Sequence, residues 1–328
     1  MTHALEWPSL TCEWLPVSNE GKTAAGGYIE QKLLLGTHTS EDEDNYLLVA
    51  KVCMPADDME VDASAADGKQ ETGGYGHNPA VAKIEIHQRI LHEGEVNRAR
   101  HMPQNPFFVA TKSPGVDVYV FDTSKHPSDP GNSTNFNPQI RLKGHDQEGY
   151  GMAWSPKKEG YFISGSDDKR VCLWDISQCT SSECETLAVF NGHSSVVEDV
   201  QFHCHHENMF ASCGDDKMLM LWDLRDSTKP TNQVQAHDAF VNCLSFNPNS
   251  EYLVVTGSED KTVALWDLRK FDAKTRLHTF ETHTDEVFCV EWSPFNETIL
   301  AVSAMLAHSV CAVFVVCPLL TFAGWHAR

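Results

Sequence analysis

The stretch "GHSSVVEDVQFHCHHENMFASCGDDKMLMLWDL", residues 192–224, decides how this chain of 328 residues folds. Two other segments align with it without gaps, one beginning at Gly144 and the other at Ala236. Each segment has an aromatic residue 9, an Asp 23 and the Asp of a Trp-Asp pair 30 residues after its His. A fixed internal spacing of this kind is typical of repeat architectures. The aligned His, inner Asp and Trp residues are His145, Asp168 and Trp174; His193, Asp216 and Trp222; and His237, Asp260 and Trp266.

Between these residues the sequence alternates apolar and polar positions, or forms short β-rich runs separated by turn residues. This pattern predicts four strands in each repeat and an all-β fold. Because a buried polar group must be paired, we expect the repeat His to bond the inner Asp and lock one hairpin. The Trp is expected to pack across the neighbouring hairpin. The segments resemble WD repeats, each of which forms one four-stranded blade of a β-propeller.

Weaker copies flank the three repeats. Residues 92–122 keep the spacing with Phe121 in the place of the Trp, and strand-like runs before them would build one earlier blade. A Gly-rich acidic stretch at about 57–79 is expected to be a loop inserted in that earlier blade. A sixth copy opens at His283. We therefore expect about five complete blades and a partial sixth over residues 1–301.

The last residues, 302–328, do not continue the sixth copy, because Ala312-Val313 stands where its Trp-Asp pair is expected. Between Val302 and Ala323 there is no Asp, Glu, Lys or Arg. An uncharged apolar run of about twenty residues is a candidate membrane helix. Val302-Ser303 can also be encoded by GTGAGT, which is typical of the start of an intron. We expect an aberrant tail outside the fold, read from an unspliced intron or equivalent gene-model error, with an alternative C terminus and a membrane anchor as the other hypotheses.

The composition favours a soluble protein with cationic partners. The chain has 46 acidic and 25 basic residues and a net charge of −21, which argues against non-specific binding to DNA or to anionic membranes. Its eleven Cys are scattered without a CxxC pair, and the N-terminal segment lacks the apolar region of a secretory signal. A reduced cytosolic or nuclear compartment fits best. We expect no metal at the His-rich stretch 202–207, because no second ligand pair lies nearby.

The positions three and five residues after each repeat His are expected to enter the innermost strand, at the face and central channel of a propeller. They hold Glu95, Asn97, Glu148, Tyr150, Val196, Glu198, Phe240, Asn242, Glu286 and Phe288. Four of these ten are acidic, whereas the chain-wide 46 in 328 predicts roughly one or two. Carboxylates bind Arg side chains, and aromatic faces hold cations, so this set suits a basic peptide. The alternative is that excess acid occupies every exposed position of so acidic a chain.

The sequence contains no catalytic constellation. The GxSxG, P-loop, HExxH and GxGxxG motifs are absent, and the repeat itself explains His145, His193, His237 and His283. A pair of carboxylates in an acidic channel could serve a hydrolase, but no spacing nominates such a pair. We therefore expect a protein that is not an enzyme and that needs no cofactor.

Several segments resemble one family beyond the generic repeat, the retinoblastoma-binding, MSI-type histone-binding WD proteins. They are "MTHALEWPSLTCEWLP", "HEGEVNRARHMPQNP", "GHDQEGYGMAWSP" and "DEVFCVEWSPFNETILA". The resemblance covers residues 1 to about 301 and implies a seven-bladed propeller. It also implies a non-catalytic histone-binding adaptor of chromatin assembly, acetyltransferase, deacetylase, remodelling and Polycomb complexes. Such a protein is expected in the nucleus, and in the cytoplasm as a histone carrier.

The resemblance further implies that the channel face grips a basic histone tail or a similar partner peptide. The residues that match the family's grip are Glu95, Asn97, Arg98, Glu148, Tyr150, Glu198, Asn242, Glu286 and Phe288. A second family site, a side groove for a histone helix, uses an N-terminal helix and an acidic loop that this chain lacks. We expect a chain truncated at both ends relative to the family, and we assign no residues to that groove.

Two other functions remain open from the sequence. The chain could be a generic WD-repeat interaction scaffold, such as a ubiquitin-ligase substrate receptor. It could also be a WD scaffold that the apolar tail tethers to a membrane.

Overall fold

Antiparallel β-sheets make up nearly all of the regular structure of this chain. The computed structural model describes residues 4–16, 28–39, 43–55, 84–131, 135–271, 276–306 and 309–316. The insertion predicted at about 57–79 and the final residues 317–328 lie outside the described residues. The chain divides into two compact units. Unit 1 comprises residues 1–101, 105–113 and 119–139, and unit 2 comprises residues 102–104, 114–118 and 140–328.

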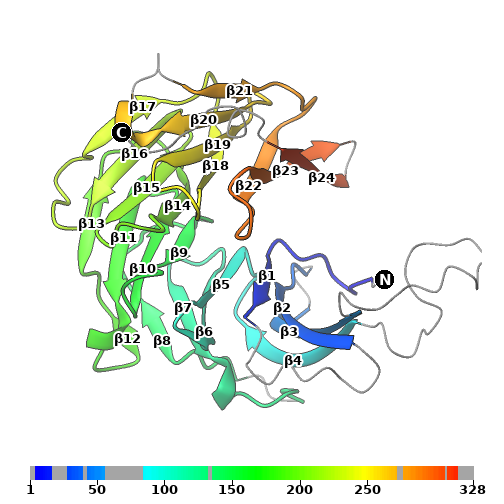
Figure 1. Ribbon diagram of the computed structural model, residues 1–328. Helices are drawn as coiled ribbons and strands as arrows, with labels where there is room; N and C mark the ends of the chain where they lie inside the picture. Colours follow the sequence, from blue (N-terminus) through cyan, green and yellow to red (C-terminus); the bar gives the residue numbers. More distant parts are fainter. Residues whose placement is uncertain are drawn as a thin grey trace, which may run out of the picture. The chain divides into compact units, whose positions relative to one another are not determined.

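Unit 1 contains a four-stranded sheet in which the strands follow chain order (Figure 1). Its strands are β1 (Cys12–Leu15), β2 (Tyr28–Gly36), β3 (Asn45–Pro55) and β4 (Ile84–His92). Most of β5 (Arg98–Met102), β6 (Asn105–Lys112) and β7 (Val118–Asp122) also belongs to this unit, and these strands are neighbours in a second sheet. The buried apolar core includes Leu34, Leu47, Ile90, Val96 and Phe121. Phe121 therefore occupies the core position that the repeat alignment predicts for a Trp.

Unit 2 contains a short parallel pair and four antiparallel sheets. The pair is β8 (Ile140–Leu142) with β12 (Glu183–Cys184). The first sheet has β9 (Met152–Trp154), β10 (Tyr161–Gly165), β11 (Arg170–Asp175) and β13 (Ala188–Asn191). The second has β14 (Val197–Phe202), β15 (Met209–Gly214), β16 (Met218–Asp223) and β17 (Asn232–Gln235). The third has β18 (Val241–Phe246), β19 (Leu253–Ser258), β20 (Val263–Asp267) and β21 (His278–Phe280). The fourth has β22 (Val287–Trp292), β23 (Ile299–Leu306) and β24 (Ser309–Val316).

The four sheets of unit 2 are blades that pack face to face in chain order. The first strand of each blade contacts the first strand of the next, so that β9, β14, β18 and β22 are successive neighbours (Figure 1). Side chains fix these strands to one another. The backbone N–H of Leu244 in β18 donates to Asp199 Oδ2 in β14 at 3.1 Å. The backbone N–H of Phe246 likewise donates to Gln201 Oε1 at 2.6 Å.

One hydrogen-bond network recurs inside the complete blades. In the second sheet, His193 Nδ1 lies 2.9 Å from Asp216 Oδ2, and its Nε2 lies 2.7 Å from Ser212 Oγ. Trp222 Nε1–H donates to the same Ser212 hydroxyl at 2.8 Å. The network spans the sheet from the loop before β14 to the hairpin between β15 and β16. It therefore joins the loop before β14 to β15 and β16 through polar groups that are all buried.

The neighbouring blades repeat this network with small changes. His237 bonds Asp260 at 3.0 Å and Thr256 at 2.8 Å, and Trp266 Nε1–H donates to Thr256 at 3.0 Å. His145 bonds Asp168 at 2.8 Å and the Ser164 hydroxyl at 3.2 Å. The three Trp side chains are at most 1% exposed. Removing a buried side chain of this size typically costs about 3–5 kcal/mol.

The Asp of each Trp-Asp pair has a separate local role. Asp175 Oδ1 accepts the backbone N–H of Ser177 and so caps the short 3-10 turn η3 (Ile176–Gln178). Asp267 caps η4 (Leu268–Lys270) in the same way through the N–H of Arg269. An Asp side chain is suited to this position because it accepts the backbone N–H two residues ahead. The two Asp residues of each repeat therefore hold two different turns.

The sixth blade lacks the partners of its repeat His. The positions 19 and 23 residues after His283 hold Val302 and Leu306, where the complete blades have Ser or Thr and Asp. His283 Nε2 is buried and has no hydrogen-bond partner among the described residues. Burial lowers the pKa of His283, because an environment of low polarity disfavours the charged ring.

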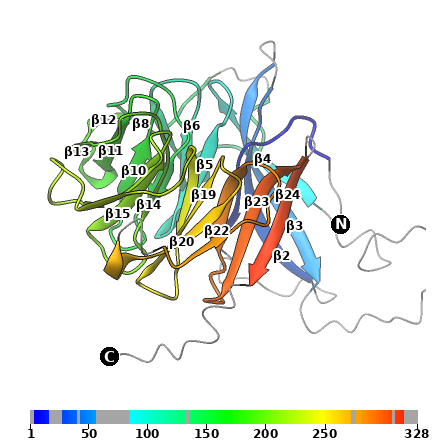
Figure 2. The same cartoon turned by 90° about the horizontal axis from the view of Figure 1, so that it is seen from above.

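Strand β23 crosses the boundary predicted after residue 301. Val302 pairs with Val290 and is 1% exposed, and Ala304 is 3% exposed. The next strand, β24, pairs with β23 along its whole length, and the two lie side by side in Figure 2. The apolar, β-branched residues of this segment suit a strand as well as a membrane helix. Among the described residues, no helix is long and apolar enough to cross a membrane.

Replacing Thr256 by Val tests the hydrogen-bond network. Thr256→Val keeps the shape but leaves His237 Nε2 and Trp266 Nε1 buried without their common partner. Each unsatisfied buried group costs about 1–3 kcal/mol, so for two groups we expect the free energy of unfolding to fall by about 2–6 kcal/mol. Urea denaturation measures the change. The same replacement at the exposed Thr231 is the control, and equal effects at both positions would contradict the role of the network.

The acid stability of the fold should depend on Asp168. Burial by itself would raise the pKa of Asp168, but the bond and charge of His145 and the N–H groups of Asp146 and Arg170 lower it to about 2 from 3.8. Because the folded-state value is below the unfolded one, the ionised carboxylate stabilises the fold above pH 4. This contribution, about 2 kcal/mol, is lost as the pH falls from about 4 through 2. Denaturation at several pH values should show that the difference in free energy of unfolding between the wild type and Asp168→Asn decreases as the pH falls from about 4 to 2.

Candidate functional site

A common register places the predicted site residues of unit 2 at one end of their blades. In each complete repeat, the residue 22 positions after the His donates its backbone N–H to the carbonyl of the residue three positions after the His. The donor–acceptor pairs are Asp167 to Glu148 at 2.9 Å, Asp215 to Val196 at 3.1 Å, and Glu259 to Phe240 at 3.1 Å. The hairpin after the second strand thus returns to the start of the first strand.

This register reveals three acidic residues that the sequence analysis did not assign to the site. Asp167, Asp215 and Glu259 each lie directly before the Asp that bonds the repeat His. Their backbone bonds place them beside the positions that were predicted. The signal was present in the sequence as a repeated pair of acids, "DD", "DD" and "ED". One member of each pair holds the hairpin, and the other adds charge to the surface.

Glu198 is the most perturbed carboxyl group of this surface. Its pKa is raised to about 7. Burial is the largest cause, and the negative charges of Asp215 and Asp167 add to the effect. The pKa of Asp215 is also raised, mainly by burial, although its hydrogen bond with Glu198 opposes this. Two carboxyl groups that share a hydrogen bond hold a proton between them, because like charges at that separation repel. Near neutral pH this pair is therefore poised to release a proton.

The close approach of two blades brings these acids together. A Cβ atom added to Gly151 would lie only 3.0 Å from the Cα of Asp199 and from the carbonyl oxygen of Glu198. The residue before β9 therefore packs closely against the backbone of β14 at Glu198 and Asp199. A larger residue at this position would separate the two backbones. Gly151 thus allows Asp167 of one blade to act on Glu198 and Asp215 of the next.

Aromatic side chains lie exposed at the same positions of the repeat. Tyr150 is 40%, Phe240 43% and Phe288 45% exposed. Exposed aromatic rings offer faces for cations and methylene chains. The remaining predicted residues of unit 2 are less open. Glu148 and Glu286 are half-buried, and the Asn242 amide donates to the Val287 carbonyl at 3.0 Å, which links β18 to β22.

The predicted residues of unit 1 lie at the start of β5. The Glu95 carboxylate lies 3.1 Å from His38 Nδ1. Asn97 is 4% exposed, and its backbone N–H donates to the Lys112 carbonyl at 2.9 Å. Its side-chain Nδ2 is buried without a hydrogen-bond partner among the described residues. Arg98 is half-buried.

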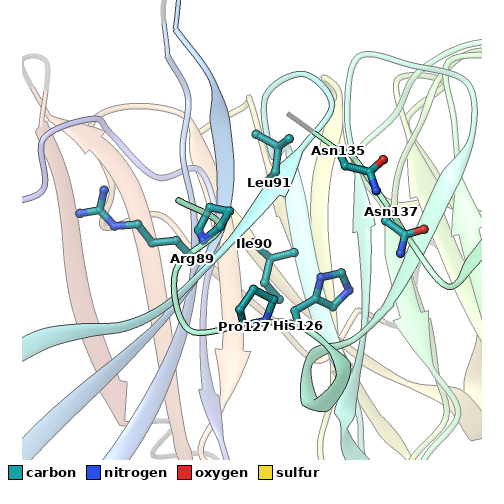
Figure 3. Close-up of a pocket in the computed structure, with 8 residues that line it drawn as sticks. Arg89, Ile90, Leu91, His126, Pro127, Asn135 and Asn137 are labelled. Atoms are coloured by element: carbon teal, nitrogen blue, oxygen red, sulfur yellow. The ribbon is translucent and has the colours of Figure 1, made fainter. Parts of the chain in front are cut away.

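Unit 1 also contains a small cavity of about 80 Å³, drawn in Figure 3. It is lined by Arg89, Ile90, Leu91, His126, Pro127, Pro130, Asn135 and Asn137. In Figure 3 the Arg89 side chain extends away from the other labelled residues. The volume suits two or three water molecules and no larger ligand. None of the predicted site residues lines this cavity.

The His-rich stretch 202–207 forms a turn. His203 Nδ1 accepts the backbone N–H groups of His205 and His206 at 3.0 Å each, and its Nε2–H donates to the Glu251 carbonyl at 2.9 Å. Burial is the main cause of the lowered pKa of His203, about 4. Both ring nitrogens are therefore occupied. In the part of the chain that the structure describes, no group of three or more His, Cys, Asp or Glu could hold a metal ion.

Comparison with protein families gives three matches along the chain. A family described as histone-binding protein RBBP4, or a subunit of the CAF1 complex, matches residues 1–56. The EIPR1 β-propeller family matches residues 153–266, and the WD domain, G-beta repeat, matches residues 274–305. The first match supports a likeness to RBBP4- and MSI-type histone-binding proteins, and the third shows a WD repeat. The predicted fold class, an all-β WD-repeat propeller, is confirmed.

The raised pKa of Glu198 predicts how the stability of the chain changes with pH. Because its folded-state pKa of about 7 exceeds the ordinary 4.5, protonated Glu198 stabilises the fold below pH 4.5, and this stabilisation is lost as the pH rises through 7. Glu198→Gln cannot ionise. We expect this variant to gain up to about 3 kcal/mol relative to the wild type between pH 4.5 and pH 8.

Urea denaturation at the two pH values measures this gain. Glu159→Gln is a matched control, because Glu159 is exposed in the hairpin at the other end of β9 and β10. A difference between wild type and Glu198→Gln that does not change with pH would contradict a shared proton at Glu198 and Asp215.

Proposed function

We propose that this chain is a non-catalytic histone-binding protein that acts as an adaptor in chromatin complexes. The match of residues 1–56 to a family described as a histone-binding protein supports this proposal. Its partners would be core histones and components of chromatin assembly, acetyltransferase, deacetylase, remodelling or Polycomb complexes. It would act in the nucleus, and in the cytoplasm as a histone carrier.

The proposed binding surface for a basic histone tail in unit 2 is the acidic end of its blades. The observation that carries this proposal is the register that sets Asp167, Asp215 and Glu259 beside Glu148, Val196 and Phe240. Three successive repeats thereby present carboxylates at one end. Arg and Lys side chains of a peptide would bind these carboxylates through charge-assisted hydrogen bonds. In unit 1, Glu95, Asn97 and Arg98 are separately proposed as peptide-binding residues.

The exposed aromatic rings would complete this surface. Tyr150, Phe240 and Phe288 would hold the methylene stems or the charged ends of basic side chains. Glu286 would add a further carboxylate at the last blade, and Asn242 would keep the first strands of two blades in place. A histone tail is an extended basic segment, so successive side chains could reach carboxylates on successive blades.

Replacing Glu148 by Gln tests the peptide-binding surface. Loss of a charge-assisted interaction costs about 1.5–3 kcal/mol, so the affinity for a basic Ala-Arg-Thr-Lys-type peptide should fall roughly tenfold or more. Calorimetric titration of full-length protein measures the affinity. Glu159→Gln makes the same charge change at the opposite end of the blade and should bind like the wild type. The affinity should also decrease with salt, because exposed charges are screened.

The affinity should also depend on pH through Glu198. A cationic peptide favours ionised Glu198, so binding should release a proton near pH 7 and should strengthen from pH 6 to pH 8. The strengthening should disappear in Glu198→Gln. A wild-type chain that does not bind the basic peptide would contradict the proposal. That result would favour a generic interaction scaffold, such as a ubiquitin-ligase substrate receptor.

A further inference from the structure

The loop between β11 and β13 contains a disulfide between Cys179 and Cys184. Their Cα atoms are 5.3 Å apart, and it is the one disulfide among the described residues. The scattered positions of the cysteines favour the reduced state and do not predict this bond. The other described cysteines take part in no disulfide, namely Cys12, Cys53, Cys172, Cys204, Cys213, Cys243 and Cys289.

The disulfide loop supports the strand that it contains. Around β12, the Ser182 carbonyl accepts the N–H of Arg141 at 2.7 Å, and the Cys184 carbonyl accepts the N–H of Lys143 at 2.9 Å. These bonds attach β12 to β8 in a parallel pair. Cys179 directly follows the turn η3, so the disulfide ties β12 to the end of the β11 segment.

The same loop contacts the residues that precede His145. Gly144 has a φ of +147°, and a Cβ there would lie 2.3 Å from Thr186 Cγ2. The Lys143 carbonyl accepts Trp174 Nε1–H at 3.0 Å, whereas Trp222 and Trp266 donate to hydroxyl groups of their own blades. The position of β12 therefore affects Lys143, whose carbonyl is the hydrogen-bond acceptor of Trp174. A change in the loop would reach Lys143 and Trp174 through backbone contacts.

The two cysteine residues differ in exposure. Cys184 is 7% exposed, whereas Cys179 is only partly buried. An external thiolate must approach a sulfur atom directly to exchange with a disulfide. Attack at Cys179 is therefore favoured, and Cys184 is the leaving group.

We propose that Cys179 and Cys184 form a reversible thiol-modification site that exchanges with glutathione. The thiolate of one glutathione attacks Cys179 Sγ, forms a mixed disulfide there, and breaks the bond to Cys184, which leaves as a thiolate and takes up a proton. A second glutathione thiolate attacks the glutathione sulfur, and releases the Cys179 thiolate and glutathione disulfide. Two electrons pass to the protein disulfide in total. Glutathione disulfide reverses both steps.

Reduction would release β12 from its covalent tie to η3. The two backbone bonds, together with the ion pair of Glu183 and Lys143 at 3.9 Å, would then hold the strand. We infer that the amides of Arg141 and Lys143 exchange faster with solvent in the reduced protein. Trp174 Nε1–H would also gain exchange, because its acceptor is the Lys143 carbonyl. The redox state of the disulfide would therefore change the hydrogen exchange of a group in the hydrogen-bond network of the blade.

The test uses the full-length chain equilibrated with glutathione or with glutathione disulfide. Peptide mapping after alkylation should show a Cys179–Cys184 disulfide in the oxidised sample and two alkylated thiols in the reduced one. In Cys184→Ser, glutathione disulfide should add glutathione to Cys179, and in Cys179→Ser the buried Cys184 should react at least tenfold more slowly. The exposed Cys289 is the internal reference, because it should form a mixed disulfide but no internal bond.

Hydrogen exchange supplies the second measurement. Reduction should accelerate exchange at residues 141–143 and leave residues 233–235 of β17, which stand at the same distance before His237, unchanged. The melting temperature should fall by roughly 4 °C, as expected for a short closed loop. Two free thiols at positions 179 and 184 in the presence of excess glutathione disulfide, or faster reaction of Cys184 than of Cys179, would overturn the proposal.

Discussion

The bond from a buried His to the Asp of a hairpin turn is the constraint on which the blades depend. Both groups are desolvated, and each is costly to bury without the other. The second ring nitrogen meets a buried hydroxyl of the next strand, and in two blades the Trp shares that hydroxyl. The loop before the first strand and the next two strands of a blade are thereby held by one chain of polar contacts in an apolar interior. In the sixth blade Val302 replaces the hydroxyl, and His283 keeps a buried nitrogen without a partner among the described residues.

The proposed binding surface follows from the same hairpin. The turn that must contain an Asp for the His also carries an acid one residue earlier, at the end where the first strand begins. Asp167, Asp215 and Glu259 reach this end because their N–H groups close the hairpin onto the first strand. Asp167 and Asp215 repel a charge on Glu198, and this repulsion, added to burial, raises the pKa of Glu198. A cationic peptide would relieve that repulsion, so the surface is electrostatically prepared for a positively charged ligand.

The blade that contains His145 differs from its neighbours in how its Trp is held. Trp174 donates to the backbone carbonyl of Lys143, which precedes the repeat. The N–H of Lys143 in turn donates to Cys184, in the strand β12 of the disulfide loop. The other two blades close their networks within the repeat. A change in the loop would therefore act on the acceptor of Trp174, whereas the acceptors of Trp222 and Trp266 lie within their own repeats. The Cys179–Cys184 pair therefore lies at the blade in which reduction of the disulfide would affect a buried side chain, Trp174.

The sequence by itself determined the repeat, the four strands of each complete blade, the His–Asp pairs and the all-β class, because these depend on spacing within one repeat. It also nominated Glu198 and the exposed aromatics. Only the tertiary structure decided which residues meet between blades. The raised pKa of Glu198 needs Asp167 of the preceding blade, and Asn242 turned out to bond the Val287 carbonyl of the following one. The disulfide and the passage of β23 through residue 301 are likewise matters of distance and pairing in space. Spacing along the chain cannot reveal them, because contacts between strands distant in sequence are set by how the blades pack.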